Sequence, residues 1–400
     1  MSTLAGSRAD TGFDRRGLAD LGSGHFVIDA CVGAVPAVIP VFVTLYALSD
    51  LQASLILAAS LVVSSATQPL FGLLADRSTM PAFVWGGVAL AAIGFALSGV
   101  AGSYAGVMAL IVVSGVGVAA FHPEAARVSN QIAGHQKATG LAWFMVGGNA
   151  GFAAGPLLVA AFIPLLAERA TLVFLLLGAA VSAWLWWERQ RLAVPVPIRE
   201  PSGRVRGEGG RSHVPGLTLL LVVTSLRTWT QFGLLALGPL FLVGQRGFSD
   251  AAAGFSVFYF AFAGAAGTIV GAAIAERVGG RRMLVWTMPL ATPLVAGFLL
   301  ADGALGLAFL SAAGFVLMAS FSVTVVMGQD YLPHRLALAA GLMIGFGAIG
   351  SAAPGLALFG ALADAAGRET ALWVIAALPV LGGLLAIGLP SPRRAEEAPA

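Results

Sequence analysis

The chain has 400 residues, of which 58% are hydrophobic and only 10% are charged, with a formal net charge of +3. Soluble globular domains carry about 25% charged residues, so this composition excludes an ordinary soluble enzyme, and its hydrophobicity excludes intrinsic disorder. The single cysteine, Cys31, excludes an intramolecular disulfide framework and a cysteine-rich zinc site.

Apolar runs long enough to cross a bilayer recur along the whole chain. A membrane helix needs about 20 apolar residues, and the runs bounded by charged or turn residues predict twelve such helices. The sequence therefore predicts an all-α polytopic membrane protein. In chain order the expected spans are 24–46, 52–75, 81–101, 105–126, 138–166, 170–187, 216–243, 252–275, 283–301, 304–330, 338–363 and 370–389.

The longest polar stretch divides six spans from six, which predicts two six-helix bundles. Its arginines are mixed with glutamates and prolines, so we expect a linker and not a nucleic-acid site. The N-terminal tail lacks the apolar core that a cleavable signal peptide needs. The expected parts are a cytoplasmic tail 1–23, a bundle 24–187, a cytoplasmic linker 188–215, a bundle 216–389 and a cytoplasmic tail 390–400.

Basic residues predict the orientation, because cytoplasmic loops carry an excess of Lys and Arg. If both termini are cytoplasmic, only Arg169, Arg246 and Arg368 fall in outside loops and Arg227 falls within a span. Every other basic residue then lies inside. We expect a multi-pass protein of a bacterial-type plasma (inner) membrane with both termini in the cytoplasm.

The two halves of the sequence resemble each other at an offset of about 200 residues. Asp76-Arg77 ends the second span and Glu276-Arg277 ends the eighth, while Gly155-Pro156 of the fifth span matches Pro354-Gly355 of the eleventh. Internal repeats of this kind are typical of secondary transporters.

These motifs resemble the major facilitator superfamily of transporters. The run from Gly72 to Arg77 and the run from Glu276 to Arg282 are similar to its loop signature, although Ser78-Thr79-Met80-Pro81 replaces the usual basic tail. Gly151-x-x-x-Gly155-Pro156 resembles part of the fifth-helix antiporter signature. The resemblance implies the two-bundle facilitator fold and a gating role for Gly72, Asp76, Arg77, Gly155, Pro156, Glu276 and Arg277.

A narrower resemblance covers nearly the whole chain outside the termini and the linker. The residues that carry it are similar to the fosmidomycin-resistance subfamily of facilitators, which implies a proton-driven efflux pump. Asp330 stands where that subfamily more often has Glu. The residues are His25, Asp29, Gln68-Pro69, Phe121-His122-Pro123-Glu124, Arg127, the run Val146 to Asn149 and the run Gln329 to Pro333.

Two carboxylates within predicted spans are candidates for proton coupling. Asp29 follows His25 by four residues, so both lie on one helix face, about 6 Å apart along the axis. A partly desolvated carboxylate can take and release a proton near physiological pH. We therefore predict that Asp29, Glu124 and His25 couple protons. The alternatives are an Asp29 satisfied by a helix end or by His25, and a Glu124 that forms an interfacial ion pair with Arg127.

Arg227 is the candidate for binding an anionic group of a substrate. It lies about ten residues into the seventh span, roughly 15 Å deep and near the bilayer midpoint. Its planar fork suits phosphate, phosphonate or carboxylate. The alternative is a structural partner for a buried acid such as Asp29. The other predicted substrate-binding residues are Gln231, His122, Asn149 and Gln68, for which interhelical hydrogen bonding is the alternative.

The combined expectation is a proton-coupled antiporter that exports a small anionic drug or metabolite of the fosmidomycin type by alternating access. The alternative is a proton-coupled importer or facilitator of a sugar or organic acid. A membrane receptor or embedded enzyme is disfavoured, because the sequence shows no sensor domain and no catalytic constellation. The expected partners are a small-molecule substrate, protons and the lipid bilayer, with no enzymatic activity, cofactor, metal or nucleic acid, and the protein is expected to be a monomer.

Overall fold

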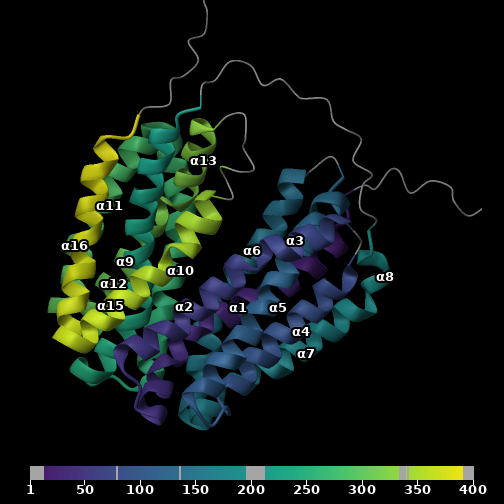
Figure 1. The fold of residues 1–400 in the computed structure, drawn as a ribbon, viewed down its shortest axis with the longest axis horizontal. Helices are drawn as coiled ribbons and strands as arrows, with labels where there is room; N and C mark the ends of the chain where they lie inside the picture. Colours follow the sequence, from purple (N-terminus) through teal and green to yellow (C-terminus); the bar gives the residue numbers. More distant parts are fainter. Residues whose placement is uncertain are drawn as a thin grey trace, which may run out of the picture. The chain divides into compact units, whose positions relative to one another are not determined.

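The computed structural model describes residues 13–77, 80–134, 137–194, 212–332, 339 and 342–390. These residues are almost entirely helical, and none of them lies in a β-strand. Contacts divide the chain into two compact units (Figure 1). Unit 1 comprises Met1–Val38 and Val62–Arg199, and unit 2 comprises Ile39–Leu61 and Glu200–Ala400. The predicted all-α fold class is confirmed, whereas the predicted bundle boundaries stay a prediction.

The first half of the chain contributes nine helical segments to the described structure. They are α1 (Arg15–Tyr46), α2 (Asp50–Ala66), α3 (Gln68–Arg77), α4 (Pro81–Ser98), α5 (Tyr104–Ile132), α6 (Lys137–Leu166), the 3₁₀ turn η1 (Ala167–Leu172), α7 (Val173–Trp187) and α8 (Arg189–Leu192).

The second half contributes eight more described segments, all in unit 2. They are α9 (Val214–Arg246), α10 (Asp250–Val278), α11 (Gly280–Leu300), α12 (Gly303–Ala319), α13 (Phe321–Tyr331), the π-helix η2 (Leu342–Gly350), α15 (Ala352–Ala366) and α16 (Arg368–Ile387).

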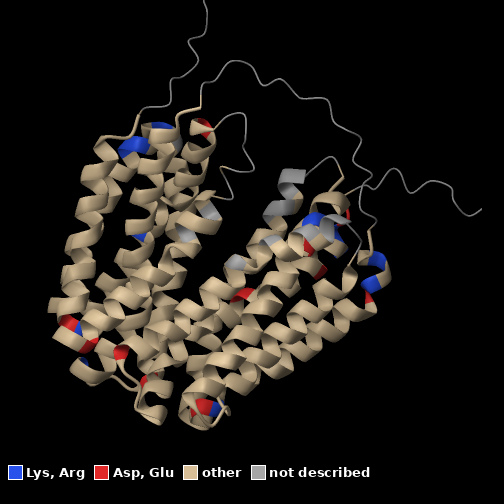
Figure 2. Cartoon of the chain, in the orientation of Figure 1, with Lys and Arg blue, Asp and Glu red and all other residues tan. Residues whose placement is uncertain are grey.

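Each of the twelve predicted spans falls on one or two of these segments. By length and hydropathy, eleven described stretches can cross a membrane, and one of them, Trp143–Trp187, takes in two predicted spans. Charged residues gather toward the helix ends, while their middle parts are almost free of charge (Figure 2). The chain is therefore a multi-pass membrane protein.

Three interruptions and one early start were not predicted. The second span divides at Thr67, whose hydroxyl donates to the Val63 carbonyl at 2.6 Å, and the tenth divides at Ser320. The eleventh begins as a π-helix. Helix α1 begins at Arg15, well before residue 24, because the Asp14 carboxylate accepts the Gly17 N–H at 3.0 Å and so caps a further helical segment.

Glycines at every fourth position bring α6 against α1 within unit 1. A Cβ atom at Gly147, Gly151 or Gly155 would meet the backbone carbonyl of Gly22, Phe26 or Ala30 on α1, respectively. Small residues at this spacing let membrane helices pack closely. The two helices therefore lie in backbone contact over two turns, and this contact positions the residues of α1 described below.

Replacing Gly151 with Ala will destabilise unit 1, because the new methyl group overlaps the Phe26 carbonyl. We expect a loss of about 1–3 kcal/mol, as for other overpacked cores, and hence a lower melting temperature in detergent. Gly86→Ala is the matched control, since a Cβ at Gly86 meets nothing within 4 Å. Equal melting temperatures for the two variants would contradict the helix contact.

Candidate functional site

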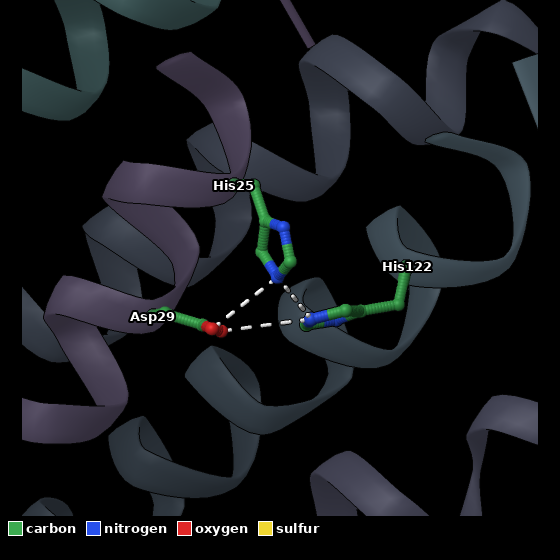
Figure 3. Close-up of side chains that lie close together, drawn as sticks. All are labelled: His25, Asp29 and His122. Carbon is green, nitrogen blue, oxygen red and sulfur yellow. Dashed lines mark hydrogen bonds and ion pairs between the residues drawn. The ribbon is translucent and has the colours of Figure 1, made fainter. Parts of the chain in front are cut away.

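Two histidines and an aspartate converge inside unit 1 (Figure 3). His25 and Asp29 come from α1, and His122 comes from α5. His25 Nε2 lies 3.2 Å from Asp29 Oδ2, and His122 Nε2 lies 3.5 Å from Asp29 Oδ1. The two Nε2 atoms lie 3.2 Å apart. We call these three residues the His–Asp centre.

One backbone carbonyl fixes the tautomer of each imidazole. His25 Nδ1 lies 2.9 Å from the Phe144 oxygen, and His122 Nδ1 lies 2.8 Å from the Val118 oxygen. A carbonyl oxygen only accepts, so each Nδ1 carries the hydrogen and donates it. Each Nε2 of a neutral imidazole then presents a lone pair. Two lone pairs and a carboxylate thus face one another. These electron-rich groups repel one another unless a proton or another cation lies between them.

The centre is enclosed on one side and accessible on the other. The His25 side chain is only 3% exposed and stacks on Phe144, with ring centroids 4.1 Å apart. The Asp29 and His122 side chains are 24% and 23% exposed. Gly148 gives the centre room, since a Cβ there would lie 2.7 Å from Asp29 Oδ2 and would also collide with the His25 ring. The centre is therefore closed on the side of His25 and partly open on the side of Asp29 and His122.

The three donor atoms of the His–Asp centre also lie within 4.8 Å of one another. Nitrogen and oxygen donors at this spacing can hold a transition-metal ion such as Zn²⁺. A metal chelator is accordingly a necessary control in any measurement of protons at this centre.

Glu124 makes its described hydrogen bonds to Met80 and Arg127 and not to the His–Asp centre. It is fully buried, and Arg127 binds both of its oxygens, with Nε–Oε2 and Nη2–Oε1 distances of 2.9 and 2.6 Å. The Met80 N–H donates to Oε1 at 3.2 Å, and Arg127 also donates to the Val194 carbonyl at 3.0 Å. The pair thus ties the start of α4 and the end of α8 to α5. This geometry matches the ion-pair alternative, and a proton-coupling role for Glu124 stays a prediction.

Arg227 is a buried cation in unit 2. Its residue exposure is 1%, and its guanidinium carbon lies 5.4 Å from the centre of the Phe321 ring. Nη1 lies 3.5 Å from Gln231 Oε1 and 3.6 Å from Met318 Sδ. Nε and Nη2 have no hydrogen-bond partner, and no carboxylate in the described part of the chain pairs with the guanidinium.

The two unpaired nitrogens of Arg227 form one edge of the guanidinium fork. That edge presents two parallel N–H groups, the geometry that binds two oxygens of a carboxylate or phosphate-like anion. A buried charge without a partner is costly. The sequence-based alternative of a buried acid as partner finds no support among the described residues, while the predicted neighbour Gln231 is in place.

The residues that follow Arg227 hold the π-helix η2. The Thr228 hydroxyl donates to the Gly347 carbonyl at 2.9 Å, and the Trp229 indole donates to the Ser351 carbonyl at 2.6 Å. Short π-helical segments leave carbonyls that need such partners and often lie at functional sites. Sequence reasoning missed this feature, for which the density of glycines from 341 to 350 is the one available signal.

The remaining predicted residues are not brought to either centre by any hydrogen bond in the described structure. Asn149 is exposed on α6, and Gln68 is half-buried at the start of α3. Gly155 and Pro156 are buried in α6, Gly72 lies in α3 near Pro123, and Arg277 is exposed at the end of α10. The side chains of Asp76, Arg77 and Glu276 lie outside the described residues. The roles of all these residues stay predictions.

Comparisons with known proteins agree with this architecture. The chain is 30% identical to the uncharacterised MFS-type transporter YfnC of Bacillus subtilis (strain 168), over 94% of this chain and 93% of the relative. It is 28% identical to the fosmidomycin resistance protein of Escherichia coli (strain K12), over 98% and 97%.

Solved structures show the same fold at low sequence identity. A bacterial homologue of the human lysosomal transporter Spinster superposes with a TM-score of 0.82 at 16% identity, covering 96% of this chain and 97% of the other. The nucleoside transporter NupG superposes with a TM-score of 0.73 at 13% identity, covering 94% and 99%. The model of the Major Facilitator Superfamily matches residues 21–353. The chain thus belongs to the Major Facilitator Superfamily and is a multi-pass membrane transporter.

Proposed function

We propose that the protein is a proton-coupled antiporter that exports small anionic compounds, of which fosmidomycin is one, from the bacterial cytoplasm. The observation that carries the proposal is the His–Asp centre, in which two fixed lone pairs and a carboxylate meet inside a membrane helix bundle. A proton placed among these groups relieves the repulsion between them.

The centre is suited to respond to a membrane pH gradient. An imidazole is the side chain that ordinarily titrates between pH 5 and 8. A proton between the two Nε2 atoms and Asp29 draws α1 and α5 together, and its loss leaves like groups facing one another. Proton binding therefore favours one arrangement of these two helices over another, which is the differential affinity that coupling requires.

Arg227 supplies the contact for the anion in this proposal. Its unpaired Nε–Nη2 edge suits a two-oxygen anion, and Phe321 and Met318 lie against the buried guanidinium. The name of the Escherichia coli relative, similar over 98% of this chain, supports fosmidomycin as a test substrate. Antiport results if the proton favours the state that faces one side of the membrane and the anion favours the state that faces the other.

The remaining parts of the proposal follow from the sequence. The excess of basic residues in alternate loops supports cytoplasmic termini, and the bacterial sources of the two relatives support a bacterial inner membrane. One chain contains both the His–Asp centre and Arg227, so a monomer is sufficient.

Proton movement in everted membrane vesicles tests the proposed function. With a pre-formed acidic interior and EDTA present, we expect fosmidomycin to dissipate the pH gradient in vesicles that contain the protein and not in vesicles from an empty-vector strain. Further acidification of the interior on addition of a neutral sugar or an organic acid, with no response to fosmidomycin, would favour the importer reading, because a symporter moves proton and substrate in the same direction. No response to any anion from abundant, folded protein would overturn the proposal.

A further inference from the structure

The donor atoms of the His–Asp centre are spaced like the ligands of a tetrahedral metal ion. Its two nitrogen–oxygen distances are 3.2 and 3.5 Å, and its nitrogen–nitrogen distance is 3.2 Å. Ligands that lie about 2.0–2.1 Å from a tetrahedral Zn²⁺ lie about 3.3–3.4 Å from one another. An ion among these atoms can therefore reach both imidazoles and the carboxylate with little movement of α1 or α5.

The other ring nitrogen of each histidine is held as it is in metal sites. A metal-ligating histidine usually donates its second ring N–H to a carbonyl or carboxylate group, which orients the ring toward the ion. His25 Nδ1 donates to the Phe144 carbonyl at 2.9 Å, and His122 Nδ1 donates to the Val118 carbonyl at 2.8 Å. These backbone groups are independent of the ligand spacing, and they direct both Nε2 lone pairs into the centre.

The donors and the exposure of the centre determine which ions fit. Two imidazoles and one carboxylate suit Zn²⁺ and other first-row transition metals, whereas Mg²⁺ and Ca²⁺ prefer oxygen ligands. The partial exposure of the Asp29 and His122 side chains leaves a side at which water can bind as a fourth ligand. Gly148 faces the same donors, since a Cβ there would collide with His25 Nε2 and lie 2.7 Å from Asp29 Oδ2.

We propose that His25, Asp29 and His122 bind one divalent transition-metal ion, such as Zn²⁺, with water as the fourth ligand. The ion lies between lone pairs and a carboxylate that otherwise repel one another. The inference goes beyond the proposed function, because metal binding needs only the three donors and neither transport nor a substrate. Spacing along the sequence did not indicate this site, because His122 follows His25 by 97 residues and comes from another helix.

Zinc titration of the purified, tag-free full-length protein tests the site. After treatment with EDTA and its removal, we expect isothermal titration calorimetry to show one Zn²⁺ per chain, also in a large excess of Mg²⁺. His25→Asn and His122→Asn each remove one nitrogen ligand but can keep a donor for the backbone carbonyl, so the zinc affinity should fall at least about a hundredfold. His213→Asn is the matched control, since His213 lies in unit 2 and caps α9.

Replacing Gly148 with Ala tests the geometry while all three ligands remain. The new methyl group takes space between the donors, so we expect the zinc affinity to fall about tenfold or more. Gly86→Ala should leave it unchanged, because a Cβ at Gly86 meets nothing within 4 Å. Co²⁺ in place of Zn²⁺ reports the coordination geometry through its visible absorption. The melting temperature without metal identifies the variants that fold, and only these are compared.

The outcomes separate the metal site from the proposed function. Saturable binding of one Zn²⁺ that is lost in the folded histidine variants supports the site, whatever fosmidomycin does in the transport assay. Binding of several ions per chain, binding that the histidine variants retain, or no binding at all would overturn the site. The transport assay contains EDTA, so its result stands in either case.

Discussion

Replacing Arg227 with Gln is expected to raise the anion concentration for half-maximal transport about a hundredfold. The unpaired Nε–Nη2 edge offers two charge-assisted hydrogen bonds, each worth about 1.5–3 kcal/mol. Arg227→Lys keeps the charge but loses the planar pair of donors, so we expect a smaller increase of about tenfold. Concentration dependence of substrate-driven proton movement in everted vesicles measures both effects.

The same variant separates an anion site from a structural arginine. Because no described carboxylate compensates the buried charge, Arg227→Gln should leave the melting temperature in detergent without substrate unchanged or raise it. An arginine that neutralised a buried acid would instead lower it. Arg246→Gln is the control, since Arg246 lies at the end of the same helix and pairs with Asp302. Unaltered apparent affinity in both Arg227 variants would refute the anion site.

The spans were predictable because the apolar run that a bilayer demands is a property of consecutive residues. The interruptions within the spans were not predictable from such runs. The division at Thr67, whose hydroxyl bonds its own helix, lies two residues before Pro69, which has no N–H to donate. The π-helix is held by partners from α9 that lie more than 100 residues away in the sequence. Local hydrophobicity carries no information on either.

The candidate site shows the same division between local and distant causes. The i, i+4 spacing placed His25 beside Asp29 correctly, because helix geometry alone decides it. His122 was predicted to bind substrate, which stays a prediction, and the packing of α5 against α1 brings it to Asp29. The two tautomers could not be predicted, because the carbonyls of Phe144 and Val118 that fix them are backbone groups, which every residue carries.

Replacing Asp29 with Asn is expected to abolish substrate-driven proton movement while leaving the protein folded and able to bind the anion. Asn keeps the size of the side chain but removes the negative charge that makes a proton between the imidazoles favourable. We expect at least about a tenfold fall in protons moved per unit time, measured with EDTA present, and binding of labelled substrate to purified protein within about threefold of wild type.

Histidine variants distinguish a loss of proton coupling at this centre from a loss of folding. His122→Asn can keep a donor for the Val118 carbonyl while removing Nε2, so it should lose proton coupling as Asp29→Asn does. His213→Asn is the matched control. The His213 Nδ1 atom accepts the Gly216 N–H at 2.9 Å to cap α9, a role that an Asn oxygen retains. Full proton movement in Asp29→Asn and His122→Asn would remove the coupling role from this centre and transfer it to Glu124, whose bidentate pair with Arg127 would then have to open during transport.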